Sequence, residues 1–180
     1  LSKSLGIVAN VYSRMGNYPK AMELYLEKLK LEESGKNPRN LASVLLNIGI
    51  VYSFQQDYSE ALGYYKKADN IISANKIKEM VHYVNINLGD IYEKLKKIDS
   101  AQYYYNLTYQ NAIQTQNIHN EALAYIGLGN VYSKIGQEYL AIQNYNKAIP
   151  ILNQEKNFEL LSETYLGLAK VHNLFGNEKE

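Results

Sequence analysis

Apolar and small residues recur at helical spacing along the chain. One stripe, at positions i, i+3, i+4 and i+7, consists of Leu45, Ile48, Gly49 and Tyr52. Positions with this spacing share one face of an α-helix. After a short polar gap, the stretch 58–68 shows the same spacing with tyrosine, alanine and leucine. Each block of this kind therefore predicts two amphipathic helices joined by a turn.

The pattern returns every forty residues. The segments GIVY, GDIY and GNVY begin at Gly49, Gly89 and Gly129, and the weaker copies ANVY and AKVH begin at Ala9 and Ala169. Two more columns keep this register without insertion or deletion: Ala21, Ala61, Ala101 and Ala141, and Tyr25, Tyr65, Tyr105 and Tyr145. A fixed period of this length is typical of a repeat protein.

Residues between the stripes predict where helices begin and end. Asn37 stands before Pro38, which is typical of an N-cap followed by proline in the first turn. The same register holds Asn117 and Asn157, and turn glycines are expected at Gly16, Gly136 and Gly176. Pro150 lies late in a second helix, where its missing N–H predicts a kink or a helix end near 146–150.

The stretch GLGNVYSKIG at 127–136 could suggest a phosphate-binding loop. A dinucleotide fingerprint needs a third glycine where Tyr132 stands, and a strand before it. Gly129 instead shares a repeated column with Gly49 and Gly89. Small residues are needed where two helices cross closely. We therefore assign the stretch to the scaffold.

Composition limits the classes of partner. The chain carries 19 basic and 18 acidic residues, so it lacks the positive surface that nucleic acid or anionic lipid requires. No run approaches the roughly 18 apolar residues of a membrane span. The chain starts at Leu1 without a leader pattern, and we expect an excised fragment. The compartment stays open, with the cytoplasm slightly favoured over the periplasm.

Catalytic and metal-binding patterns do not stand out. His82 lies three residues after Glu79, but a metal site needs at least a third ligand, and His119 and His172 have no partner at matching spacing. No P-loop, nucleophile elbow or metalloprotease motif occurs. We expect no enzymatic activity, no metal and no cofactor, and we interpret the histidines as satisfied or solvated.

The repeated unit resembles the tetratricopeptide repeat. The resemblance is carried by LGNVYSKIGQEYLAIQNYNKAI at 128–149 and IGIVYSFQQDYSEALGYYKKAD at 48–69. Each has a small residue, a tyrosine three residues later, a turn, and then the pattern Y-x-x-A followed by tyrosine and alanine, except that Glu138 takes the place of the first tyrosine of this pattern in the former. Gln56 and Lys96 depart from the turn glycine, which leaves the turn geometry in question. A unit of forty residues instead of about 34 is similar to the long-repeat subset of the family.

This resemblance implies an all-α fold, a right-handed α-solenoid of stacked antiparallel helix pairs. We expect residues 1–180 to form a single array with repeats at approximately 1–37, 38–77, 78–117, 118–157 and a truncated fifth at 158–180. The last repeat lacks its second helix, so Tyr165, Leu168 and Phe175 should be partly uncovered. We expect the native protein to continue, or another copy to cover this edge.

The polar face of each first helix is the candidate binding surface. Its three columns hold Asn47 and Asn87; Asn10, Asp90, Asn130 and Lys170; and Arg14, Phe54, Lys94 and Lys134. We call these ten the groove residues. An asparagine amide offers a donor and an acceptor to a peptide backbone, and the basic residues favour an acidic ligand. The alternative interpretation is ordinary solvation of a polar helix face.

Two functions follow from the resemblance. The first is a non-enzymatic scaffold that binds a protein or peptide segment in its concave groove, as the repeat region of a larger bacterial signalling or regulatory protein. The second is a sensor segment that controls a linked histidine kinase, phosphatase or DNA-binding domain by conformational change or self-association. An appended catalytic or DNA-binding domain in the full gene would favour the second.

Overall fold

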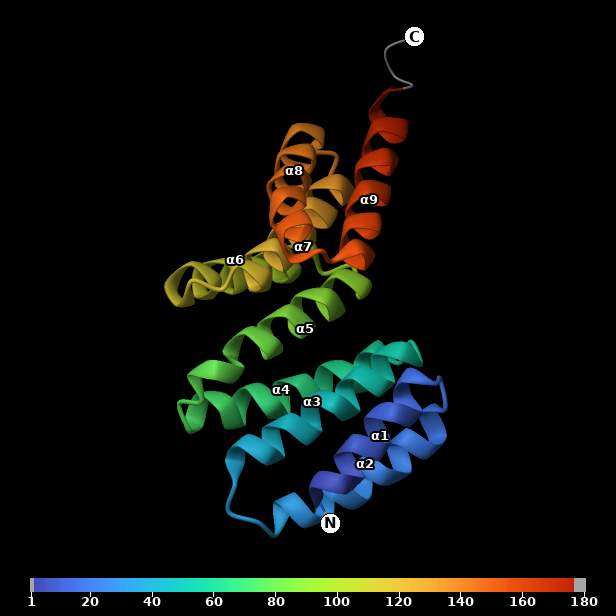
Figure 1. Ribbon diagram of the computed structural model, residues 1–180, viewed down its shortest axis with the longest axis vertical. Helices are drawn as coiled ribbons and strands as arrows, with labels where there is room; N and C mark the ends of the chain where they lie inside the picture. Colours follow the sequence, from blue (N-terminus) through green and yellow to red (C-terminus); the bar gives the residue numbers. More distant parts are fainter. Residues whose placement is uncertain (1, 177–180) are drawn as a thin grey trace. The chain divides into compact units, whose positions relative to one another are not determined.

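The computed structural model describes residues 2–176, and side chains up to residue 174. All regular elements in this range are helical (Figure 1), which confirms the predicted all-α class. They are α1 (Ser2–Arg14), α2 (Tyr18–Glu33), α3 (Pro38–Phe54), α4 (Tyr58–Ala74), the 3₁₀ turn η1 (Lys78–Met80), α5 (Val81–Lys94), α6 (Ile98–Thr115), α7 (Ile118–Lys134), α8 (Glu138–Glu155) and α9 (Phe158–Gly176).

The chain divides into two compact units, residues 1–91 and 92–180, and the boundary falls within α5. In the first unit α1 packs against α2, and α3 packs against both α2 and α4. In the second unit α7 packs against α6 and α8, and α9 packs against α8. Helices that follow each other in the chain therefore lie side by side within each unit. The division of 1–180 into five repeats of one array stays a prediction.

The turns between paired helices share one backbone conformation. Gly16 and Gly136 both have φ of 75°, in the left-handed region that glycine adopts without strain. Gln56 and Lys96, which replace glycine in this column, have φ of 63° and 58°. The replacement therefore leaves the turn geometry unchanged, although a left-handed conformation costs a non-glycine residue about 1–2 kcal/mol.

The asparagine column forms the predicted N-caps. The side-chain oxygens of Asn37, Asn117 and Asn157 accept hydrogen bonds from backbone N–H groups three residues later, at 3.2, 3.0 and 3.2 Å. In the third copy the column holds Ile77, which cannot cap, and the 3₁₀ turn η1 precedes α5 there. The capping side chain thus decides how each first helix begins.

Pro150 lies inside α8, which continues to Glu155. The helix therefore does not end at this proline, and the kink expected near 146–150 stays a prediction. Pro150 removes only one backbone hydrogen bond, and the fully buried Ala148 and Leu152 on either side of it hold the helix by packing.

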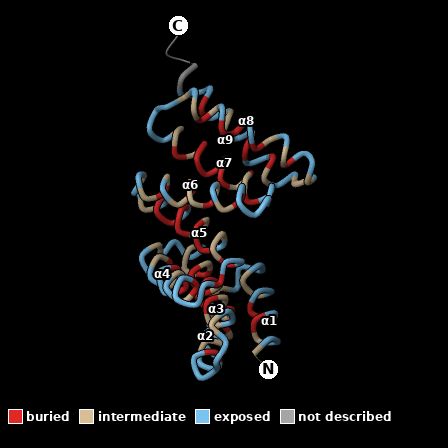
Figure 2. The backbone as a smooth tube through the Cα atoms, turned by 90° about the vertical axis from the view of Figure 1, so that its left-hand side faces the viewer, coloured by how far each residue is buried: buried red, intermediate tan, exposed pale blue. Residues whose placement is uncertain are grey.

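The repeated tyrosines form the centre of the core. Tyr25, Tyr65, Tyr105 and Tyr145 are only 1–2% exposed, and the alanines of the neighbouring column, Ala21, Ala61, Ala101 and Ala141, are fully buried. Figure 2 shows that buried residues gather along α3 and α7, the first helices of their pairs. The core of each unit therefore lies where first and second helices meet.

Glycine columns make room for these tyrosine rings. A Cβ atom added at Gly49 would lie 2.4 Å from a ring carbon of Tyr65, and one at Gly129 would lie 2.7 Å from the ring of Tyr145. Gly167 of α9 approaches the same Tyr145 ring, again at 2.7 Å. The small residues thus accommodate an aromatic ring, and not only a close crossing of two backbones.

The last helix exposes part of its apolar surface. Leu161 and Val171 are buried, while Tyr165 and Leu166 are exposed and Leu168 is half-buried. Tyr165 and Leu168 are thus partly uncovered, as the half-repeat predicts, and the side chain of Phe175 lies outside the described residues. Self-association through this edge stays a prediction.

Two glycines of the first unit offer a matched test of the ring contact. Gly49→Ala should destabilise the fold by about 1–3 kcal/mol, because the new methyl group collides with Tyr65. Gly63 lies in the interior of α4 and has open space around it, so Gly63→Ala should stabilise the fold by about 0.5–1 kcal/mol. Urea unfolding measures both changes. Equal effects of the two substitutions would contradict the assigned packing.

Candidate groove sites

Four groove residues meet in one hollow of the first unit. The hollow, of about 560 Å³, lies between α1 and α3 and reaches the buried Tyr25 of α2. Its lining includes Asn10, Arg14, Asn47 and Phe54. Within α1 the lining positions follow helical spacing, and so do those within α3, since each helix turns one stripe toward the hollow. The first unit thus brings together every groove residue predicted on α1 and α3.

Side chains around this hollow are partly held by internal contacts. The Tyr25 hydroxyl donates a hydrogen bond to Oδ1 of Asn10, which uses one of the two lone pairs of that oxygen. The side chain of Asn47 makes no hydrogen bond within residues 2–174. The Phe54 ring stacks on Tyr18, with centroids 5.8 Å apart. Asn10 therefore offers a ligand its amide N–H groups and one remaining lone pair, whereas the donor and acceptor groups of the Asn47 side chain are both free of internal partners.

Four more groove residues line a hollow of about 400 Å³ in the second unit. They are Lys94, Asn130, Lys134 and Lys170. Asn130 repeats the arrangement of the first unit, since its Oδ1 accepts a hydrogen bond of 2.7 Å from the Tyr145 hydroxyl. The same hollow also contains two carboxylates that sequence reasoning missed, Glu93 and Glu163.

Glu93 changes the charge of the second hollow. Only 8% of this residue is exposed. Its carboxylate accepts a hydrogen bond from the Tyr105 hydroxyl at 2.9 Å and pairs with Lys134 at 2.8 Å. Lys134 therefore already has an anionic partner in the protein, and its preference for an acidic ligand stays a prediction. The sequence does mark Glu93 as unusual, because the equivalent positions of the other three copies that precede α9 hold serine: Ser13, Ser53 and Ser133.

The remaining two groove residues lie in neither hollow. The amide nitrogen of Asn87 donates to the backbone oxygen of Tyr83 at 2.6 Å, one turn back in the same helix. Asp90 lies near Tyr65, where its negative charge adds to burial in raising the pKa of that phenol. Sequence reasoning placed both residues in the groove by periodicity alone.

Burial perturbs the core tyrosines. It raises the pKa of Tyr25 to about 12. Burial also raises the pKa of Tyr145 to about 12, with smaller contributions from the carboxylates of Glu93 and Glu163. Both effects disfavour the phenolate. The tyrosines that contact the two hollows are therefore neutral hydrogen-bond donors over the ordinary pH range.

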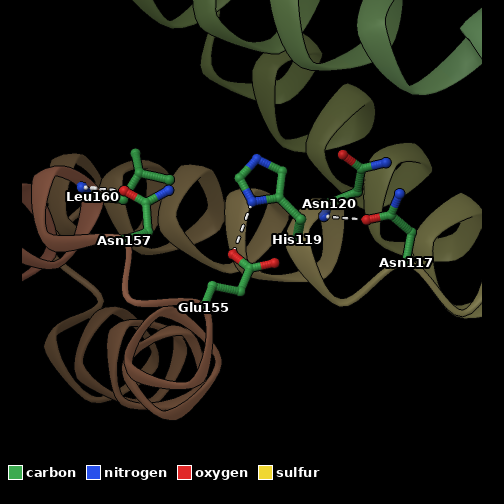
Figure 3. Close-up of polar contacts among 6 residues, drawn as sticks. All are labelled: Asn117, His119, Asn120, Glu155, Asn157 and Leu160. Carbon is green, nitrogen blue, oxygen red and sulfur yellow. Dashed lines mark hydrogen bonds and ion pairs between the residues drawn. The ribbon is translucent and has the colours of Figure 1, made fainter.

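A third hollow lies at the turn between α8 and α9. His119 Nδ1 contacts Oε2 of Glu155 at 2.9 Å (Figure 3). Both residues line a space of about 710 Å³ together with 156–159. Figure 3 also shows the neighbouring Asn117 and Asn157 bound to the helix starts that they cap. This pair links the start of α7 to the end of α8, and it gives His119 a partner that its sequence spacing did not reveal.

Residues 2–176 hold no group of three histidine, cysteine, aspartate or glutamate side chains that could bind a metal ion. In the same range, none of the helices combines the length and the apolar character that crossing a membrane requires.

The family is shown by sequence comparison. The family model described as "Tetratricopeptide repeat" matches residues 2–71 and 81–154, which is more than half of the chain. The chain therefore belongs to the tetratricopeptide repeat family, and the resemblance inferred from its repeats is confirmed. Among curated proteins, no match to the sequence is found.

Solved structures share the fold at low sequence identity. BtubC (BKLC) from P. vanneervenii gives a TM-score of 0.82 at 22% identity, covering 97% of this chain and 72% of that one. The apo form of RapI gives 0.85 at 14% identity, covering 98% and 64%. Aspartyl phosphate phosphatase F from Bacillus subtilis gives 0.65 at 19% identity, covering 97% and 50%. These similarities confirm the predicted class, a right-handed α-solenoid of helix pairs, and the chain spans less than two thirds of RapI and half of the phosphatase.

Alkaline pH should destabilise the protein through its core tyrosines. The folded pKa of Tyr145, about 12, lies above the ordinary value of 10.0, so the folded state retains a proton that the unfolded chain releases. This stabilisation is complete below pH 10.0 and is lost as the pH rises through about 12. Urea unfolding at a series of pH values should show the loss.

Tyr145→Phe tests the assignment of this effect. The variant lacks one titrating phenol, so its stability should fall less steeply than that of the parent over this pH range. At neutral pH it should be about 0.5–1.5 kcal/mol less stable, because the hydrogen bond to Asn130 is lost. Tyr139→Phe alters an exposed residue and serves as the control. Parallel curves for Tyr145→Phe and the parent would contradict the assignment.

Proposed function

We propose that the chain is a protein-binding scaffold that holds a segment of its partner in the hollows of its first helices. The proposal is carried by one observation: eight of the ten groove residues line two open hollows, four in each unit. Repeat proteins of stacked helix pairs use such surfaces for binding, and the tetratricopeptide repeat family to which the chain belongs is in general non-enzymatic.

The internal hydrogen bonds support recognition of a peptide backbone. In Asn10 and Asn130 a core tyrosine occupies the side-chain oxygen, and this contact fixes the orientation of the amide. A preoriented donor loses less conformational entropy when a ligand binds. Each of these asparagines is thus linked to the core through its side-chain oxygen. Its proposed role is to donate an amide N–H to a backbone carbonyl oxygen of the partner.

We propose in addition that the scaffold acts in bacterial signalling. One protein of the same fold is described as an aspartyl phosphate phosphatase, and such chemistry belongs to regulatory phosphorylation. The alternative is a sensor segment that controls a linked histidine kinase, phosphatase or DNA-binding domain by conformational change or self-association. Both versions place a protein partner, and no nucleic acid or membrane, on the repeat surface.

Selection from a displayed library of random twelve-residue peptides tests the scaffold function. Enriched peptides should bind the chain and lose affinity about two- to tenfold on Asn47→Ala, which is one lost hydrogen bond. Phe54→Ala should weaken binding as well. The side chain of Asn47 forms no hydrogen bond within residues 2–174, so Asn47→Ala should change stability little. Phe54→Ala also removes the stacking contact with Tyr18, and circular dichroism verifies that both variants are folded.

Tyr139→Ala is the matched control for this experiment, because Tyr139 is exposed and lines none of the hollows described above. It should leave affinity unchanged. Folded Asn47→Ala and Phe54→Ala variants that bind the peptides as tightly as the parent would place the site elsewhere and contradict the proposal.

A further inference from the structure

The two hollows differ in the charged groups of their linings. In the first unit Arg14 is the only charged residue of the lining, and it has no ion pair within residues 2–174. The lining of the second hollow holds two carboxylates, Glu93 and Glu163, and three lysines, Lys94, Lys134 and Lys170, of which Lys134 is paired with Glu93. A carboxylate of a ligand would therefore meet a single cation with no carboxylate beside it in the first unit, and cations mixed with carboxylates in the second.

The first hollow also exposes an apolar surface. Ile7, Val11 and Phe54 are 58%, 51% and 57% exposed, respectively. Ile50 of α3 lines the same space and is half-buried. Stacking on Tyr18 holds the Phe54 ring in place without covering it. An aliphatic or aromatic side chain of a ligand can cover this surface and gain the free energy of apolar burial.

The asparagines of this hollow favour an extended ligand over a helical one. A helix satisfies its own backbone groups except at its ends, whereas an extended segment presents unpaired N–H and C=O groups along its length. Asn47 offers both kinds of partner, and Asn10 offers a donor beside it. These amides can therefore pair with the backbone of an extended ligand, but not with the backbone in the interior of a helical one.

We propose that the hollow of the first unit binds an extended peptide segment that carries an apolar side chain and a carboxylate two residues apart. This inference rests on the proposed scaffold function. Along α1 the rise of about 1.5 Å per residue separates Arg14 from Val11 by about 4.5 Å and from Ile7 by about 10.5 Å. Side chains two residues apart in an extended segment share one face and lie about 6.7 Å apart, which falls between these values. The apolar side chain lies against Ile7 and Val11, and the carboxylate pairs with Arg14.

Arg14 also lies in the last turn of α1, where a basic residue stabilises a helix through its macrodipole. That role concerns only the charge and the stability of the fold. Pairing with a ligand carboxylate depends in addition on the ligand. Binding measured with acidic peptides and with their amide counterparts separates the two roles.

The test uses the peptides enriched from the random twelve-residue library. We expect an aspartate or glutamate two residues from an apolar residue in these sequences. Arg14→Gln should lower the affinity for an acidic peptide about five- to tenfold, because a charged hydrogen-bonded pair is lost. The affinity for the corresponding asparagine or glutamine peptide should fall less than about twofold. Arg14→Lys should bind the acidic peptide more tightly than Arg14→Gln does, because lysine keeps the positive charge. Lys66→Gln, an equal charge change at an exposed residue of α4, should leave both affinities unchanged.

The outcomes distinguish this inference from the function on which it rests. Two results overturn the inference and leave the scaffold function standing. In the first, the enriched peptides depend on Asn47 and Phe54 but contain no acidic residue. In the second, Arg14→Gln lowers the affinity of the acidic peptide and of its amide counterpart equally. An acid three or four residues from the apolar side chain, the helical spacing, also overturns the inference. A library that yields no enriched peptide overturns both.

Discussion

The contact of a buried tyrosine ring with a glycine on the neighbouring helix is the constraint on which the repeats depend. Tyr65 packs against Gly49, and Tyr145 fits between Gly129 and Gly167, at distances that leave no space for a Cβ atom. One aromatic ring therefore sets the separation of a first and a second helix, and in the second unit that of the following first helix as well. The ring supplies apolar area, and its hydroxyl supplies a polar end that needs a partner.

That polar end connects the core to the candidate binding surface. The hydroxyls of Tyr25 and Tyr145 each donate to an asparagine at the rim of a hollow, and that of Tyr105 donates to the buried Glu93. A buried phenol without such a partner would be costly. The polar face of the first helices is thus partly a requirement of the fold. Polar side chains that have no such partner in the described residues, such as Asn47 and Arg14, are the stronger indication of a ligand site.

Features with a local cause could be predicted from the sequence. Helix stripes, N-caps at Asn37 and Asn117, and turns at Gly16 and Gly136 each depend on neighbouring residues, and the strict period of forty residues repeats them. Gln56 shows the limit of this reasoning, since the turn keeps its left-handed form without glycine. Side-chain contacts between different helices could not be predicted. Lys134 has the spacing of a groove residue, and only the packed structure brings it to Glu93.

The central claim is that partner segments bind to the hollows of the first helices through the asparagine amides. Nuclear magnetic resonance of the asparagine side-chain amide groups during titration with a bound peptide tests it most directly. The account predicts that the signals of Asn10 and Asn47, or of Asn130, shift on binding while that of Asn70, an exposed residue of α4, does not move. Saturable binding that leaves the signals of these three asparagines in place would contradict the account.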